Sequence, residues 1–214
     1  MNQRITPQVR REIVKWIVQA ILGLVGYGLI LFLPAGRIDW IWGWAQLVVV
    51  AAFLAAHPLL LIPINPELLA EREKGFRDEG VKPWDKWIAG LAAGAIVPLW
   101  VIAGLDLRFG WTGTMPIAVH LGGLLANVLG YGLFLWAMVS NAFFAEGVRI
   151  QEERGHRVAT QGPYRYVRHP GYAGAILSGI ATPFLLGSLW TLIPAAISAG
   201  LYVLRTGLED RTLM

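Results

Sequence analysis

The stretch richest in side chains that could do chemistry is Thr160–Gly174, which reads TQGPYRYVRHPGYAG. Its glycines and prolines predict a rigid loop whose backbone N–H and C=O groups remain available to a small polar molecule. Three tyrosines offer flat faces to a heterocycle or a cation, and Arg168 and His169 place donors beside them. The same composition suits a loop that anchors to lipid headgroups, and both interpretations stay open at this level.

A second pair of charges follows the last apolar block, in the segment LRTGLEDRTLM. Arg205 and Glu209 are four residues apart, so on a helix they share one face. A solvated pair at this spacing would contribute only about 0.3–0.5 kcal/mol to stability. Alternatively, the pair lies at the mouth of a membrane cavity, where the arginine takes an anionic group and the carboxylate takes an ammonium.

Several other chemistries are excluded or disfavoured by composition. The chain has no cysteine, which excludes disulfides, thiolate nucleophiles and cysteine metal sites. No two of its four histidines have the spacing of metal ligands on a helix, so we predict no metal site. His57 and His120 stand in apolar runs, where we expect them to pack or to form hydrogen bonds.

Long apolar runs must position these residues. Of all residues, 56% are apolar and 15% are charged, whereas a soluble domain is about a quarter charged. Four runs each approach the roughly 20 residues that cross a bilayer: Ile13–Leu33, Trp40–Ile62, Trp87–Leu105 and Pro116–Val139. The first run is longer than the apolar core of a signal peptide, so we expect a retained first span.

The last apolar block, Tyr172–Leu204, differs from the four runs because Pro183, Gly187, Ser188 and Pro194 interrupt it. Each half is short for a crossing, and two helices joined at the tight turn LGS fit it best. The sequence therefore predicts an all-α, polytopic transmembrane protein with four spans plus a C-terminal helical hairpin. We expect a single integral membrane domain covering residues 1–214.

The basic residues predict the orientation of this domain. All but two of the 18 Lys and Arg fall before or at the start of the first run, in two alternate connections or after the last apolar block, and the exceptions are Arg37 and Arg108. The positive-inside rule then places the N-terminus, the loop Asn65–Lys86, the segment Asn141–Gly171 and the C-terminus in the cytoplasm. Because topology explains these charges, their number does not predict nucleic-acid binding. Membrane lipids are the expected surroundings.

The two cytoplasmic connections have their own expected structures. The loop Asn65–Lys86 is mixed in charge and predicts a short amphipathic helix at the interface. The charges of residues 141–154 recur with a helical pattern, which predicts that the fourth span continues into the cytoplasm and ends near Gly155. A short extended piece, a turn at Pro163 and a helix entered at Pro170 should follow.

The run VRIQEERGHRVATQGPYRYVRHPGYAG, the apolar hairpin and RTGLEDRTL together resemble the isoprenylcysteine carboxyl methyltransferase family. NPELLAER, at Asn65–Arg72, also resembles bacterial members. The family consists of integral membrane enzymes that use S-adenosyl-L-methionine and are related to phospholipid N-methyltransferases. The resemblance implies that residues 141–214 form the cofactor-binding portion.

The family's site residues carry over where the sequence matches. Implied cofactor-binding residues are Gln151, His156, Arg157, Val158, Ala159, Tyr164, His169, Pro170, Gly171, Tyr172 and Glu209. Glu209 resembles the carboxylate that closes on the cofactor, and Arg205 the arginine that binds the methyl acceptor. These two are the expected catalytic residues.

The resemblance implies methyl transfer from S-adenosyl-L-methionine to a lipophilic acceptor that enters from the bilayer. A carboxyl group, as in isoprenylcysteine, or a thiol is the expected acceptor, because a carboxylate needs no general base. Phospholipid amine methylation is an alternative, although an amine must lose a proton to a base such as Glu209 or His169. A non-catalytic transporter or lipid-binding subunit is another, and the scarcity of ionisable residues in the apolar runs argues against a transporter.

Overall fold

We describe a computed structural model of the chain, which covers residues 6–75, 80–149, 151, 155 and 157–213. In these residues the structure is helical, without strands. The long helices are α1 (Pro7–Ala35), α2 (Ile41–Ile64), α4 (Pro83–Phe109), α5 (Ile117–Val139), α6 (Pro170–Leu186) and α7 (Leu192–Leu213). Two short helices complete the set, α3 (Pro66–Lys74) and the 3-10 turn η3 (Gly162–Arg165).

Four of these helices, α1, α2, α4 and α5, are long and apolar enough to cross a membrane. They confirm the four spans predicted from the sequence. Their outward faces carry large exposed apolar side chains, such as Leu22 on α1, Val48 on α2 and Leu125 on α5. Many exposed apolar side chains on spanning helices fit a protein whose solvent is lipid.

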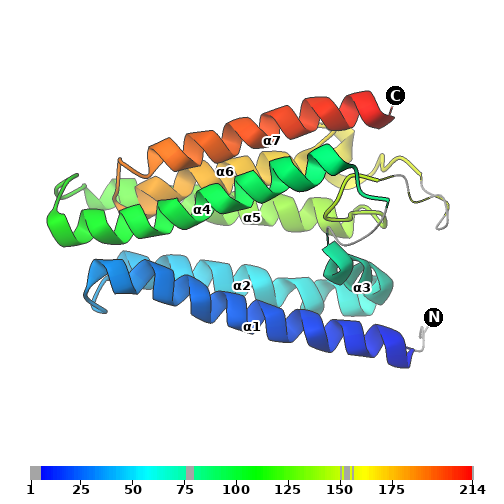
Figure 1. Cartoon of the computed structure of the whole chain (residues 1–214), viewed down its shortest axis with the longest axis horizontal. Coiled ribbons are helices and arrows are strands. Elements are labelled where there is room, and N and C mark those ends of the chain that lie inside the picture. Colours follow the sequence, from blue (N-terminus) through cyan, green and yellow to red (C-terminus); the bar gives the residue numbers. More distant parts are fainter. Residues whose placement is uncertain (1–5, 76–79, 150, 152–154, 156, 214) are drawn as a thin grey trace.

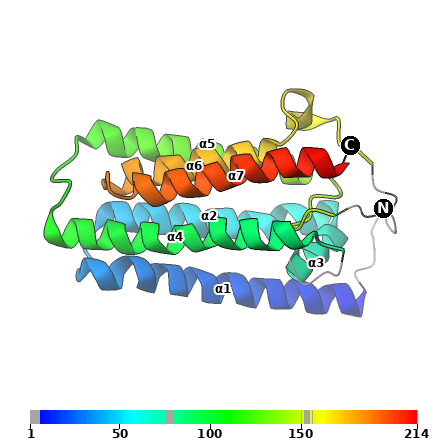
Figure 2. The same cartoon turned by 45° about the horizontal axis from the view of Figure 1, so that its top comes forward.

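The long helices lie side by side along one axis, which places the connections at two opposite ends (Figures 1 and 2). The short connections α1–α2, α4–α5 and α6–α7 share one end. The other end holds both marked termini, α3 and the segment between α5 and α6. We call this second end the site end. The structure thus gathers at one end all the segments that the basic residues predict to be cytoplasmic.

Helices α5 and α6 pack closely because glycines line their contact. A Cβ added at Gly130 would lie 2.6 Å from the backbone nitrogen of Ser178, and one at Gly174 would lie 2.5 Å from the backbone oxygen of Gly130. Small residues at these positions allow the two backbones to approach, as is common between membrane helices. Asn127 then reaches across to donate to the Ser178 carbonyl at 3.0 Å.

The predicted C-terminal hairpin is confirmed. Helix α6 ends at Gly187, which has a left-handed conformation with φ of 78° and donates its N–H to the Pro183 carbonyl. Ser188 follows and donates to the carboxylate of Asp106, which also accepts from Thr112. These contacts fasten the hairpin turn to the end of α4.

The predicted continuation of α5 beyond Val139 is wrong. Residues 140–149 form turns and bends, and Asn141 accepts from the N–H of Phe143. Further along, Val148 donates its N–H to Asp85 and accepts from the N–H of Lys82. Pairing with the start of α4 therefore prevails over the local helical pattern.

The short helix α3 confirms the helix expected within Asn65–Lys86. Asn65 accepts from the N–H of Leu68 at 3.1 Å, and Pro66 stands at the first helical position, as helix starts favour. Leu68 and Leu69 are buried, together with Ile13 and Met138. The helix is thus packed against the spans at the site end.

Candidate functional site

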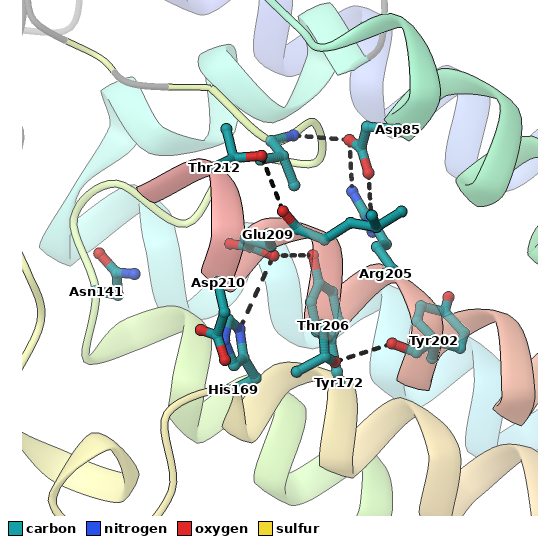
Figure 3. Close-up of polar contacts among 12 residues, drawn as sticks. Asp85, Asn141, His169, Tyr172, Tyr202, Arg205, Thr206, Glu209, Asp210 and Thr212 are labelled. Carbon is teal, nitrogen blue, oxygen red and sulfur yellow. Dashed lines mark hydrogen bonds and ion pairs between the residues drawn. The ribbon is translucent and has the colours of Figure 1, made fainter. Parts of the chain in front are cut away.

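The candidate site begins where α6 and α7 meet at the site end, and Figure 3 shows its polar contacts. Tyr172, in the first turn of α6, donates its hydroxyl to Glu209 of α7 at 2.6 Å. His169, just before α6, lies with Nε2 2.9 Å from Asp210 and with Nδ1 3.8 Å from Glu209. The rings of His169 and Tyr172 stack at 5.6 Å between centroids. We call these four residues the α6–α7 cluster.

Arg205 lies one helical turn below Glu209 and is held by Asp85 of α4. Its Nε donates to one carboxylate oxygen at 2.6 Å, and its Nη2 donates to the other at 2.9 Å. Nη2 also donates to the backbone carbonyl of Glu146 at 2.5 Å. Asp85 is completely buried and accepts a further bond from the N–H of Val148. This ion pair therefore joins α4, α7 and the segment after α5.

The guanidinium of Arg205 also lies over the ring of Tyr172, 5.0 Å from its centroid. Tyr202, one turn earlier on α7, is 5.8 Å from Tyr172 between ring centroids. Tyr202, Arg205 and Glu209 of α7 thus all contact Tyr172 of α6. Aromatic faces and a carboxylate are groups that bind a cation.

The loop before α6 packs on the turn after α5. Asn141 donates to the hydroxyl of Tyr164 at 3.3 Å, and burial raises the pKa of that phenol. A Cβ at Gly171 would meet the ring of Phe144 at 2.7 Å. Gly162 has φ of 57° and lies against Ser140. These contacts fix the polar loop relative to α5 and α6.

The sequence-predicted residues divide into three groups. Tyr172, His169 and Glu209 come together, and Tyr164 lies close enough to Glu209 to interact electrostatically. Four more lie in the segment before η3. Buried Gln151 donates to the Phe143 carbonyl, Arg157 and Val158 are exposed, and Ala159 is half-buried. Pro170 and Gly171 are buried at the start of α6, and His156 lies outside the described residues.

A cavity of about 480 Å³ lies among the long helices. Its walls include Phe53 of α2, Trp100 of α4, Tyr131 of α5, Ser178 of α6 and Tyr202 of α7. Between Gln46 and His57, both in its lining, α2 rises roughly 16 Å, so the cavity is elongated along the helices. Tyr202 and Glu146 line the cavity, while Tyr202 contacts Tyr172 and Glu146 contacts Arg205.

Sequence reasoning missed Asp85, Asp210 and Asn141 as members of the site. Asp210 is adjacent to Glu209, and its pKa is lowered by the hydrogen bond from His169. Asp85 stands at the start of the third apolar run, a position that is usual for a helix terminus near the membrane surface. The only feature of the sequence that could have pointed to Asp85 was a carboxylate followed by a long apolar helix. Its partner, Arg205, lies 120 residues further along the chain.

The fold and site define a class of protein: a polytopic helical membrane protein with a polar cluster at one end, beside an intramembrane cavity. Residues 123–214 match the model of the isoprenylcysteine carboxyl methyltransferase (ICMT) family. The family resemblance predicted from the sequence is thus confirmed over this region, and the chain is an integral membrane protein.

Two curated proteins named "Probable protein-S-isoprenylcysteine O-methyltransferase" are similar to this chain, one from Oryza sativa subsp. indica and one from Oryza sativa subsp. japonica. Each is 34% identical over 65 residues, which cover 30% of this chain and 34% of the relative. The match therefore spans about a third of the length of these relatives. No solved structure matches the chain.

Proposed function

We propose that this protein transfers a methyl group from S-adenosyl-L-methionine to a lipophilic acceptor. The preferred acceptor is a carboxyl group of the isoprenylcysteine type, and a thiol is the other candidate. The observation that carries the proposal is that Tyr202 lines the intramembrane cavity and its ring contacts Tyr172 of the α6–α7 cluster. A water-soluble donor and a lipid-soluble acceptor can then meet from two sides. The family match and the names of the two relatives support the same reaction.

The chemistry of the α6–α7 cluster fits the donor. Glu209 would bind the ammonium of its amino-acid part, since the carboxylate already faces the site and accepts from Tyr172. The stacked rings of Tyr172 and His169 would contact its cationic and flat parts. Residues 141–214 are the proposed cofactor-binding portion. Gln151, Tyr164, Pro170 and Gly171 would act mainly by fixing the loop.

The proposed roles of His156, Arg157, Val158 and Ala159 rest on the family resemblance. Val158 is 85% exposed, and no described contact joins it to the α6–α7 cluster. For these residues to contact the donor, the segment would have to close over the cluster from the outside. We keep them as proposed cofactor-binding residues on that basis.

Methyl transfer from a sulfonium to a carboxylate needs alignment rather than proton transfer. One carboxylate oxygen forms a bond to the methyl carbon while the carbon–sulfur bond breaks, and the electron pair stays on sulfur. No proton is released, so no general base is needed. The protein then contributes mainly proximity and orientation. Arg205 would hold positive charge beside the acceptor, in an orientation set by Asp85.

We further propose that the site end faces the cytoplasm. The segments gathered there carry nearly all of the basic residues, in agreement with the positive-inside rule. The acceptor would enter the cavity from the bilayer, and the donor would arrive from the cytoplasm.

Calorimetric titration of the purified protein with S-adenosylhomocysteine tests the donor site. His169→Ala and Tyr172→Ala should each weaken binding about tenfold or more, because each removes a ring of the stacked pair. Tyr166→Ala is the matched control, since Tyr166 belongs to the same loop but is 79% exposed. If both site variants bind S-adenosylhomocysteine as tightly as wild type, the loop does not bind the donor, and the interpretation that it anchors to lipid headgroups is favoured.

Transfer of labelled methyl groups to matched lipophilic acids, thiols and amines tests the acceptor. We expect Arg205→Ala to lower turnover more than donor affinity, and Glu209→Ala to lower both. Arg205→Lys should restore little, because an ammonium loses the two-pronged contact with Asp85. Amine turnover that is insensitive to Arg205 would favour the phospholipid-type alternative, and binding without turnover would favour a non-catalytic protein.

A further inference from the structure

Arg72, the last residue of the motif NPELLAER, has no role in the proposed reaction so far. It lies on α3, is only 8% exposed and lines the cavity. Its Nη1 donates to the Phe144 carbonyl, and its Nη2 contacts Glu146, each at 3.3 Å. Its Nε is buried and has no hydrogen-bond partner among the described residues.

Hydrogen bonds compensate the charge of Arg72 poorly. Its guanidinium also lies over the rings of Phe134 and Phe144, 5.8 and 5.4 Å from their centroids, but a ring face does not accept the in-plane Nε–H as a carboxylate would. Arg205 makes hydrogen bonds of 2.5–2.9 Å from its Nε and Nη2, whereas both hydrogen bonds of Arg72 are at the long end of the usual range. Burial lowers the pKa of Arg72 from its usual value, and Glu146 offsets only part of that effect. A buried, unpaired N–H of a charged group is costly unless a ligand or water meets it.

Glu146 connects Arg72 to the reaction site. Its carboxylate contacts Arg72, and its backbone carbonyl accepts from Arg205. Both Glu146 and Arg72 line the cavity, together with Tyr202, which contacts Tyr172. Arg72 therefore lines the cavity, with its unpartnered N–H buried behind that lining. Glu146 links it to Arg205, the arginine beside the α6–α7 cluster.

We propose that Arg72 binds the anionic head group of the acceptor, with its Nε–H donating to a carboxylate oxygen. This assignment rests on the proposed function and deepens it by making the acceptor an acid. It also gives the two arginines different roles. Arg205 is bound to Asp85 and supplies a positive charge in a fixed orientation. Arg72 has an N–H group that is available to donate to the ligand.

The test measures binding without turnover. Protein saturated with S-adenosylhomocysteine is titrated with S-farnesyl-N-acetylcysteine and with its carboxamide, which has the same shape but no charge. Wild type should bind the acid about tenfold more tightly than the amide. Arg72→Gln should lower the affinity for the acid about tenfold and leave the affinity for the amide unchanged.

Arg149→Gln is the matched control, because Arg149 joins the same two segments through Glu71 at 3.1 Å but does not line the cavity. It should preserve the preference for the acid. Equal binding of acid and amide by wild type would overturn the assignment, as would parallel losses for both ligands in Arg72→Gln. If Arg72→Gln does not purify, Arg72→Lys provides the comparison, and an unchanged preference in that variant would count against the proposal.

The outcomes separate this inference from the proposed function. Failure of wild type to bind S-adenosylhomocysteine would contradict the proposed function itself. Normal binding of S-adenosylhomocysteine, with an acid preference that persists in Arg72→Gln, would contradict only the role of Arg72. If a water molecule accepts the hydrogen bond of the Arg72 Nε–H in place of the ligand, the acid preference will persist in Arg72→Gln.

Discussion

Asp85 and Asp39 form two bidentate ion pairs of nearly the same geometry in very different surroundings. Asp85 accepts from Arg205 at 2.6 and 2.9 Å and is completely buried. Asp39 accepts from Arg37 at 2.6 and 2.7 Å, but its side chain is 67% exposed. Comparing their alanine variants therefore isolates the effect of burial on an arginine that loses its partner.

We expect Asp85→Ala to lower the free energy of unfolding by about 3–5 kcal/mol, because it leaves the guanidinium of Arg205 buried without its hydrogen-bonded carboxylate. At about 2–4 °C for each kcal/mol in a chain of this size, the melting temperature should fall by roughly 6–20 °C. Asp39→Ala should change it little, since water solvates Arg37 after the substitution.

Thermal unfolding of the purified variants in one detergent measures both effects. The double variant Asp85→Ala/Arg205→Ala should lose less stability than the sum of the two single variants, because removing the second charge removes the penalty. Equal shifts for Asp85→Ala and Asp39→Ala would refute the reasoning. Additive losses in the double variant would show that the penalty does not come from the unpaired charge.

Three further predictions follow from single features. Thr160→Cys should react with a membrane-impermeant maleimide only after cells are opened, and Thr114→Cys should react in intact cells; the reverse would overturn the proposed orientation. Gly130→Val should destabilise the protein by about 1–3 kcal/mol or more, because the larger side chain separates α5 from α6. Gly132→Val should be tolerated, because a Cβ added there has open space around it, and thermal unfolding compares the two variants. The carboxyl of Asp39 should titrate at a pKa of about 2 by NMR, because Arg37 donates to it. The small stabilisation by this exposed pair is then present above the usual pKa and is lost as pH falls through about 2; titration near 3.8 would contradict the ion pair.

Much of the fold could be predicted from the sequence because lipid imposes simple rules. A span needs a long apolar run with its backbone bonded internally, so the four spans followed from residue types alone. Their ends followed less closely: the first run was predicted from Ile13 and the third from Trp87, whereas α1 begins at Pro7 and α4 at Pro83. The hairpin followed from Gly187 and its neighbours, since glycine readily adopts the left-handed conformation that ends a helix. The motif around His169 and Tyr172 also identified the family region.

Only the tertiary structure decided which charges meet. Residues 140–149 have a helical pattern, yet they turn to bond with Lys82 and Asp85, because backbone pairing with a distant segment prevailed over local periodicity. The spacing in the sequence predicts that Arg205 and Glu209 share one face of a helix. The packing of α4 against α7 decides that the guanidinium of Arg205 binds Asp85. The unpartnered N–H of Arg72 is likewise a property of packing. Hydrogen bonds between segments far apart in the chain depend on how the helices dock, and no spacing in the sequence encodes that distance.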